Sequence, residues 1–171
     1  LEKELRQNKI KTYIAFNLRF HPILEWIKIN INTSEVLEAN AYCGSYLPEW
    51  RKGIDYRKCY SAIRELGGGV HLDLIHELDY LTWLFGFPDS FSSSTNKVSD
   101  LEINSADYAH YHLCYPNRNI TATLNYYRKD PKRQIEMVTK NDVIIADLLK
   151  NIVVNQKGEI LFQSELEPQS L

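Results

Sequence analysis

The sequence predicts an α+β domain, with a predominantly antiparallel open sheet and helices packed on one face of it. The second half of the chain is a succession of short segments rich in β-branched and aromatic residues, separated by turn sequences. The first half contains two segments with helical spacing of apolar residues. At 171 residues, 44% of them hydrophobic, the chain is long enough to bury one core.

The composition excludes several classes of partner. With 20 basic and 22 acidic residues the net charge is -2, so nothing favours binding to nucleic acid or to anionic lipid. No stretch approaches the ~18 consecutive apolar residues of a membrane span, and no signal-peptide pattern is present. Cys43, Cys59 and Cys114 lie far apart, which is typical of a reduced cytoplasmic protein without disulfides or a cysteine metal site. We therefore expect a cytoplasmic domain with no nucleic acid, membrane or metal partner.

The element predictions follow from periodicity and turn signals. Before residue 90 we expect the end of a charged helix at 1–8, a strand at 11–16, a helix from 21 to about 30–34, a strand at 36–42 and an apolar helix at 70–85. After residue 100 we expect strands at 108–115, 120–127, 132–139, 143–147, 151–155 and 159–163. Residues 91–100 are polar and serine-rich and predict a connection. Short turns between consecutive strands indicate an antiparallel meander.

The connection at 44–62 is long, and it is rich in tyrosine, tryptophan and arginine. Loops of this length inside a compact domain are usually functional or ordered by a partner. Aromatic stacking combined with arginine hydrogen bonds suits a sugar ring, while a structural loop and a contact between subunits are about equally good interpretations.

The segment 67–80 is the strongest candidate for chemistry. Three glycines lead directly into an apolar helix that carries ionisable residues. On one continuous helix, at about 100° per residue, Asp73 and His76 lie roughly 60° apart, with Tyr80 between them. An imidazole beside a carboxylate can act as a general acid or base, and glycines at a helix entry let a ligand approach the backbone.

A purely structural interpretation of this segment stays open. Buried His and Asp side chains are often only hydrogen-bonded core groups, and a triple glycine can simply permit close packing. Charged groups on an apolar helix are costly to bury unless they are paired, which favours a site. His71 lies about 140° around the helix from His76, so the two histidines do not predict a metal site.

His110, His112 and Tyr108 alternate onto one face of their strand. They could line a cleft, but a hydrogen-bonded role on the sheet face is the stronger interpretation. The chain contains no GxGxxG, P-loop, HExxH or GxSxG motif, so it predicts no dinucleotide cradle of the usual kind.

Two motifs resemble those of the Gfo/Idh/MocA oxidoreductases, in which a Rossmann domain is followed by an α/β domain with an open antiparallel sheet. Residues 13–22 are similar to the family's passage between the two domains, with its Asn-x-Arg-Phe-x-Pro pattern. Residues 67–79 are similar to its Gly-Gly to His-x-x-Asp helix, and residues 142–154 resemble a hairpin near its C-terminus. Segments 46–51 and 55–57 resemble those of members associated with surface-sugar metabolism.

The resemblance implies hydride transfer between NAD or NADP and a hydroxyl of a sugar, sugar derivative or polyol. His76 matches the histidine that lies close to the reacting C–OH group, and we expect Asp73 to orient it. Many members have Asp four residues before that histidine, where this sequence has Leu72, and Asp73 stands three residues before it instead. Further candidates for substrate contact are Asn17, Arg19, Tyr56, Arg57 and Tyr80.

The resemblance also divides the chain into two parts. Residues 1–20 are expected to be the end of a Rossmann domain, and residues 21–171 a C-terminal substrate-binding and oligomerisation domain. The family's Glu-Lys-Pro motif, which carries its usual catalytic lysine, does not occur in this sequence. We therefore expect no bound NAD(P) and no turnover by this chain alone, and a homo-oligomer formed through the open sheet face. The alternative is a non-catalytic module that binds a sugar-like ligand or mediates assembly.

Overall fold

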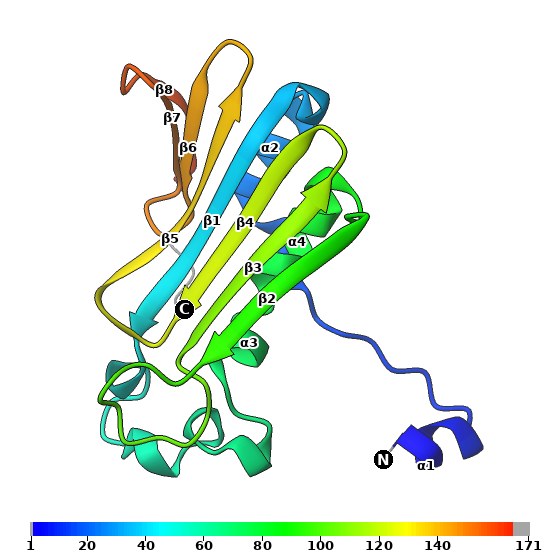
Figure 1. The fold of residues 1–171 in the computed structure, drawn as a ribbon, viewed down its shortest axis with the longest axis vertical. Coiled ribbons are helices and arrows are strands. Elements are labelled where there is room, and N and C mark those ends of the chain that lie inside the picture. The colour runs from blue at the N-terminus through cyan, green and yellow to red at the C-terminus, as the bar shows by residue number, and fades with distance from the viewer. Residues whose placement is uncertain (1, 166–171) are drawn as a thin grey trace.

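One sheet of eight strands organises the molecule, in the order β2-β3-β4-β1-β5-β6-β7-β8. The structure, a computed structural model, describes residues 2–165. Helices α2 and α4 lie against one face of the sheet, and no other element within residues 2–165 covers the opposite face (Figure 1). The expected α+β class with an open, mostly antiparallel sheet is confirmed.

The order of the strands corrects the expected meander. The strands are β1 (Val36–Tyr46), β2 (Ser90–Asn96), β3 (Tyr108–Tyr115), β4 (Arg118–Asn125), β5 (Tyr127–Thr139), β6 (Val143–Asp147), β7 (Ile152–Asn155) and β8 (Ile160–Gln163). β1 lies between β4 and β5, parallel to β4 and antiparallel to β5. Its core-facing residues Ala39, Ala41 and Cys43 are small and buried, which suits a central strand beneath packed helices.

Four helices accompany the sheet, namely α1 (Glu2–Gln7), α2 (Pro22–Asn30), α3 (Val70–Asp73) and α4 (His76–Phe85). The main core forms where Ile23, Leu24 and Ile27 of α2 and the buried side of α4 pack on the sheet. His21 is the N-cap residue of α2, and its Nδ1 accepts a hydrogen bond from the Ile23 backbone N–H at 3.3 Å. The helices expected at 1–8 and from residue 21 are confirmed, residue 1 lying outside the described part.

The strand expected at 11–16 is wrong. These residues have no regular secondary structure and lead into a short 3-10 helix, η1 (Asn17–Phe20). Tyr13 and Ile14 are 88% and 78% exposed, because no strand of the described chain lies beside them to complete a ladder. α1 consequently stands apart from the sheet at the far end of this segment (Figure 1).

Strand β2 is absent from the predictions, since residues 91–100 were expected to be a polar connection. All seven of its residues are exposed. As an edge strand it pairs only with β3, and it has no buried face that would require an apolar alternation.

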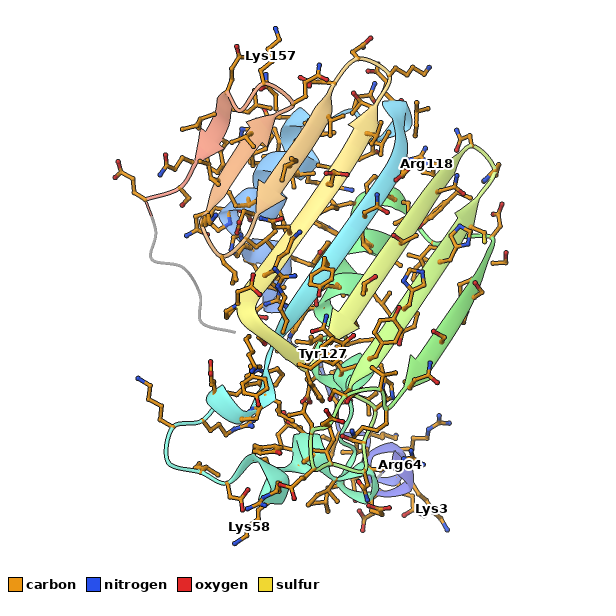
Figure 2. The ribbon with its side chains drawn as sticks, turned by 60° about the vertical axis from the view of Figure 1, so that its left-hand side comes forward. Lys3, Lys58, Arg64, Arg118, Tyr127 and Lys157 are labelled. Atoms are coloured by element: carbon orange, nitrogen blue, oxygen red, sulfur yellow. The ribbon has the colours of Figure 1, made fainter. Side chains whose placement is uncertain are left out.

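Below the sheet, the connection after β1 folds into short 3-10 turns, with Lys58 and Arg64 on its surface (Figure 2). A second, smaller core holds this region against the end of the sheet and includes Leu47, Val70, Leu74 and Tyr126. The fully buried Asp107 accepts hydrogen bonds from the backbone of residues 98 and 99, which fixes the neighbouring loop. Among residues 2–165, no helix has the length and apolar character needed to cross a membrane.

Candidate functional site around His76

The helix expected at 70–85 is interrupted. α3 ends at Asp73 and α4 begins at His76, with Leu74 outside helical geometry at φ -104°, ψ 31°. The two helices pack in different cores, since Val70 of α3 lies in the smaller core and Leu81 of α4 in the main one. One straight helix does not reach both, and the predicted 60° relation between Asp73 and His76 is therefore wrong.

Asp73 is paired with a buried tyrosine instead of with the histidine. Its Oδ2 accepts a hydrogen bond from the Tyr126 hydroxyl at 2.6 Å, and the ring of Trp50 meets Tyr126 edge-on at 5.2 Å. Burial and this carboxylate raise the pKa of Tyr126, so its hydroxyl remains a donor. Asp73 thus fastens α3 to the end of β4, and the structure does not place it where it would orient His76.

Tyr80 is also removed from the predicted set of substrate contacts. Its side chain is fully buried, and its hydroxyl has no hydrogen-bond partner among the described residues. Burial first, and then the Glu77 carboxylate, raise its pKa well above the usual range. A phenol without accessible surface cannot contact a substrate in this conformation.

A buried ion pair fixes the first turn of α4. The Arg133 guanidinium on β5 donates to both oxygens of Glu77, at 2.7 and 3.2 Å. Glu77 is fully buried and Arg133 is 8% exposed. Burial, the largest influence, lowers the pKa of Arg133, but the Glu77 carboxylate together with Cys43 and Tyr80 more than offsets it and raises that pKa, so the guanidinium stays charged.

His76 itself is half-buried at the start of α4. Its Nδ1 is enclosed by protein and has no hydrogen-bond partner among the described residues, and the Phe16 ring lies 6.1 Å away at an interplanar angle of 84°. Burial lowers the pKa of His76, and Arg133 lowers it further, against the opposing effects of Glu77 and Asp79. At pH 7 the imidazole is therefore neutral and able to accept a proton.

Asn17 and Arg19 line, with Phe16, a hollow of about 380 Å³ at the turn before α2, and His76 is not among its lining residues. Arg19 is held by Asp79 on α4, with an Nε to Oδ2 distance of 2.9 Å. Arg19 and His76, far apart in sequence, each contact the Phe16 ring.

Tyr56 and Arg57 belong to a different region. Tyr56 lines a hollow of about 450 Å³ together with Tyr46, Tyr127 and Lys129, at the end of the sheet where Figure 2 labels Tyr127. Arg57 donates to Asp55 and to Glu102, which fixes the loop. The two hollows share no lining residue, so the structure divides the predicted contacts into two groups.

Of the three glycines at 67–69, the middle one is closely approached by the chain's own backbone. A Cβ on Gly68 would collide with the Tyr60 carbonyl oxygen and would lie 2.6 Å from that of Ser61. Glycine is thus required there by the chain's own backbone, and no space remains beside it for a phosphate. In the part of the chain described, no group of three or more His, Cys, Asp or Glu residues could hold a metal ion.

Sequence reasoning missed the partners of the site. Phe16, Asp79 and the Glu77–Arg133 pair all shape the surroundings of His76. The acidic residues on this apolar helix indicate that such partners exist, because a buried carboxylate requires a hydrogen-bonding or charged partner. Nothing in the sequence says that these partners come from residue 19 and from β5.

Two features agree with the class of oxidoreductase domain that the sequence motifs suggest. They are the open sheet with helices on one face and the half-buried histidine that begins a core helix. The chain belongs to the oxidoreductase family, C-terminal alpha/beta domain, of the Gfo/Idh/MocA group, whose profile matches residues 35–166. The resemblance seen in the sequence is thereby confirmed. No curated protein sequence matches the chain.

Solved structures share the fold. UDP-N-acetylglucosamine 3-dehydrogenase GnnA from Acidithiobacillus ferrooxidans has a TM-score of 0.68 at 16% identity, over 98% of this chain and 51% of that one. The WlbA dehydrogenase from Bordetella pertussis, in complex with NADH and UDP-GlcNAcA, has a TM-score of 0.67 at 15% identity, over 85% and 45%. An oxidoreductase from Agrobacterium radiobacter, with NAD+, L-tartaric acid and magnesium, has a TM-score of 0.67 at 19% identity, over 99% and 50%. This chain therefore spans about half the length of each of them.

Proposed function

We propose that residues 21–171 are the substrate-binding and oligomerisation domain of an NAD(P)-dependent oxidoreductase that acts on a sugar, sugar derivative or polyol hydroxyl. Residues 1–20 would then form the passage from its cofactor-binding domain. The observation that carries the proposal is His76, a half-buried imidazole with a lowered pKa at the start of α4, in a chain of this family.

His76 acts on the substrate hydroxyl. Because Nδ1 is enclosed, the nitrogen that reaches the substrate is Nε2, which accepts the hydroxyl proton as the carbon gives up its hydride. The C–H and O–H bonds break and a carbonyl forms, and a nicotinamide, when bound, would accept the hydride. A neutral His76 is required for this direction, and an imidazolium returns the proton in the reverse one.

The remaining candidates divide into nearer and more distant contacts. Asn17 lines the hollow beside Phe16 and is the candidate for binding near the reacting carbon. Tyr56, which lines the other hollow, and Arg57, which binds Glu102 at its edge, are candidates for the distal part of a longer substrate. The dehydrogenases acting on or holding UDP-linked sugars among the similar structures support a nucleotide sugar as the first substrate class to test.

The test is a kinetic assay on the complete protein that contains this chain. Reduction of NAD+ and of NADP+ is followed with a panel of nucleotide sugars, free sugars and polyols, for the wild type and for His76→Gln. We expect His76→Gln to lower kcat by about 10² to 10⁴-fold, the usual contribution of a general base. The matched control is His110→Gln on the sheet, which leaves kcat unchanged.

The outcomes separate the two function classes. Turnover that His76→Gln abolishes supports the enzyme. Saturable sugar binding without any nicotinamide reduction by the complete protein would support the binding or assembly module and overturn the proposal.

The open sheet face is the proposed surface for a second copy. The register brings five polar residues into one row across five strands, namely Ser92, His112, Thr121, Asn40 and Glu136. An antiparallel sheet can leave its second face to solvent, and in a twofold dimer that face would pack against its own copy. A contact made by this face would depend on hydrogen bonds more than on apolar burial.

A further inference from the structure

We propose that Arg19 is a positioning residue, which holds the Phe16 ring against His76 through its ion pair with Asp79. The sequence suggests Arg19 as a substrate contact, but its contacts assign it this other role. The kinetic consequence rests on the proposed function of His76, whereas the structural relay can be tested without it.

The anchor of the relay is Asp79, one turn after His76 on α4. The Arg19 Nε and Nη2 atoms donate to its two carboxylate oxygens, at 2.9 and 2.5 Å. The Asp79 side chain is 5% exposed and that of Arg19 is 41% exposed. A two-point pair of this kind fixes the plane of the guanidinium as well as its position.

Arg19 in turn holds Phe16. Its guanidinium carbon lies 5.8 Å from the centre of the Phe16 ring, within the range of a cation–π contact. Its backbone N–H also donates to the Phe16 carbonyl oxygen at 3.3 Å, which closes the turn between them. The same residue therefore binds α4 with its side chain and fixes the residue that precedes η1.

Phe16 is where the exposed segment returns to the domain. Its neighbours Tyr13 and Ile14 are exposed, and no ladder holds residues 11–16. The Phe16 ring is half-buried and meets the imidazole edge-on. Without the hold of Arg19, the contact between Phe16 and His76 depends on a segment that has no regular structure.

The Phe16 ring helps to set the orientation and the water exposure of the imidazole. The charged groups acting on His76 are Arg133 from β5 and Glu77 and Asp79 from its own helix, and all three remain when Arg19 is replaced. Loss of the Phe16 contact would therefore leave these three charged groups in place but allow the His76 imidazole to change its orientation. Small misplacement of a catalytic group lowers the rate steeply.

NMR of the histidine ring protons tests the relay on the chain itself. The His76 signals, identified among the five histidines by their loss in His76→Gln, carry the ring-current shift of Phe16. Phe16→Leu removes this shift and gives its size. We expect Arg19→Gln to remove most of it, and the double variant to equal Phe16→Leu, because residues in one relay are not additive.

The matched control is Arg57→Gln. Arg57 also makes a two-point pair, with Asp55, but it lies in the loop after β1 and not beside His76. It leaves the His76 signals unchanged, and unchanged His110 and His112 signals show that each variant is folded. His76 signals that stay at their wild-type positions in Arg19→Gln would overturn the proposal.

Kinetics of the complete protein then separate positioning from substrate contact. A positioning role predicts that Arg19→Gln lowers kcat by about tenfold to a hundredfold with little change in KM. A large rise in KM at unchanged kcat would contradict it and restore Arg19 as a binding residue. If His76→Gln retains full kcat, the proposed function fails. The NMR test of the relay does not depend on that outcome.

Discussion

At the scale of single residues, the surroundings of His76 depend on two carboxylates that an apolar helix carries into the interior. Glu77 is fully buried, and Asp79 is 8% exposed. Each is satisfied by an arginine from another element, Arg133 and Arg19, through two hydrogen bonds. The sequence suggests that such groups are paired or functional, but it does not identify the partners, because these lie 56 and 60 residues away.

Removal of one member of the buried pair is predicted to be strongly destabilising. Arg133→Met leaves the Glu77 carboxylate buried and unpaired, and we expect a loss of about 3–5 kcal/mol in the free energy of unfolding at pH 7. Urea unfolding followed by circular dichroism measures it. The double variant Glu77→Gln/Arg133→Met should recover most of this loss, and a single variant as stable as the wild type would contradict the interpretation.

At the scale of elements, the strands at 108–115 and 143–147 match β3 and β6. They were predictable because their burial and turns are local signals. The lack of a strand at 11–16, the edge strand β2 and the break between α3 and α4 could not be predicted, because each depends on what lies beside the segment. A strand requires a partner, an edge strand tolerates polar residues, and a helix divides when its halves face different cores.

The start of α2 makes stability depend on pH. The Nδ1 atom of buried His21 accepts from the Ile23 N–H, its Nε2 lies 3.2 Å from the Leu148 carbonyl oxygen, and burial lowers its pKa. The unfolded chain, with an ordinary histidine pKa near ~6.5, then binds more protons than the folded one. Stability is therefore retained above about pH 6.5 and falls as the pH drops below it, and the lowered pKa of His76 acts in the same direction.

Urea midpoints at roughly pH 5.5 and pH 7.5 test this dependence. We expect His21→Asn, which retains a side-chain acceptor for the helix start, to be less stable at neutral pH but less sensitive to acid. An equal or larger loss of stability on acidification of this variant would show that His21 does not carry the effect.

At the scale of the whole molecule, helices pack on one face of the sheet to build the core and the site, and within residues 2–165 no element covers the other face, which we propose for a second copy (Figure 1). If the proposed contact forms, Thr121→Arg on β4 places a large charged side chain in the row that would meet the second copy, and it should yield monomers in sedimentation velocity. Glu25→Arg on the exposed side of α2 is the control and should leave the mass unchanged. A wild-type chain that is monomeric at high concentration, or a Thr121→Arg variant of unaltered mass, would count against this face.

The most direct test of the central claim is the pH profile of hydride transfer by the complete protein, compared between the wild type and His76→Gln. The lowered pKa of His76 predicts a rate that is constant at neutral pH and declines on acidification only below about pH 6.5, as the imidazole takes up a proton. His76→Gln should be far slower and should lack this acid limb. A variant that keeps both the rate and the acid limb would contradict the assignment of His76 as the group that accepts the hydroxyl proton.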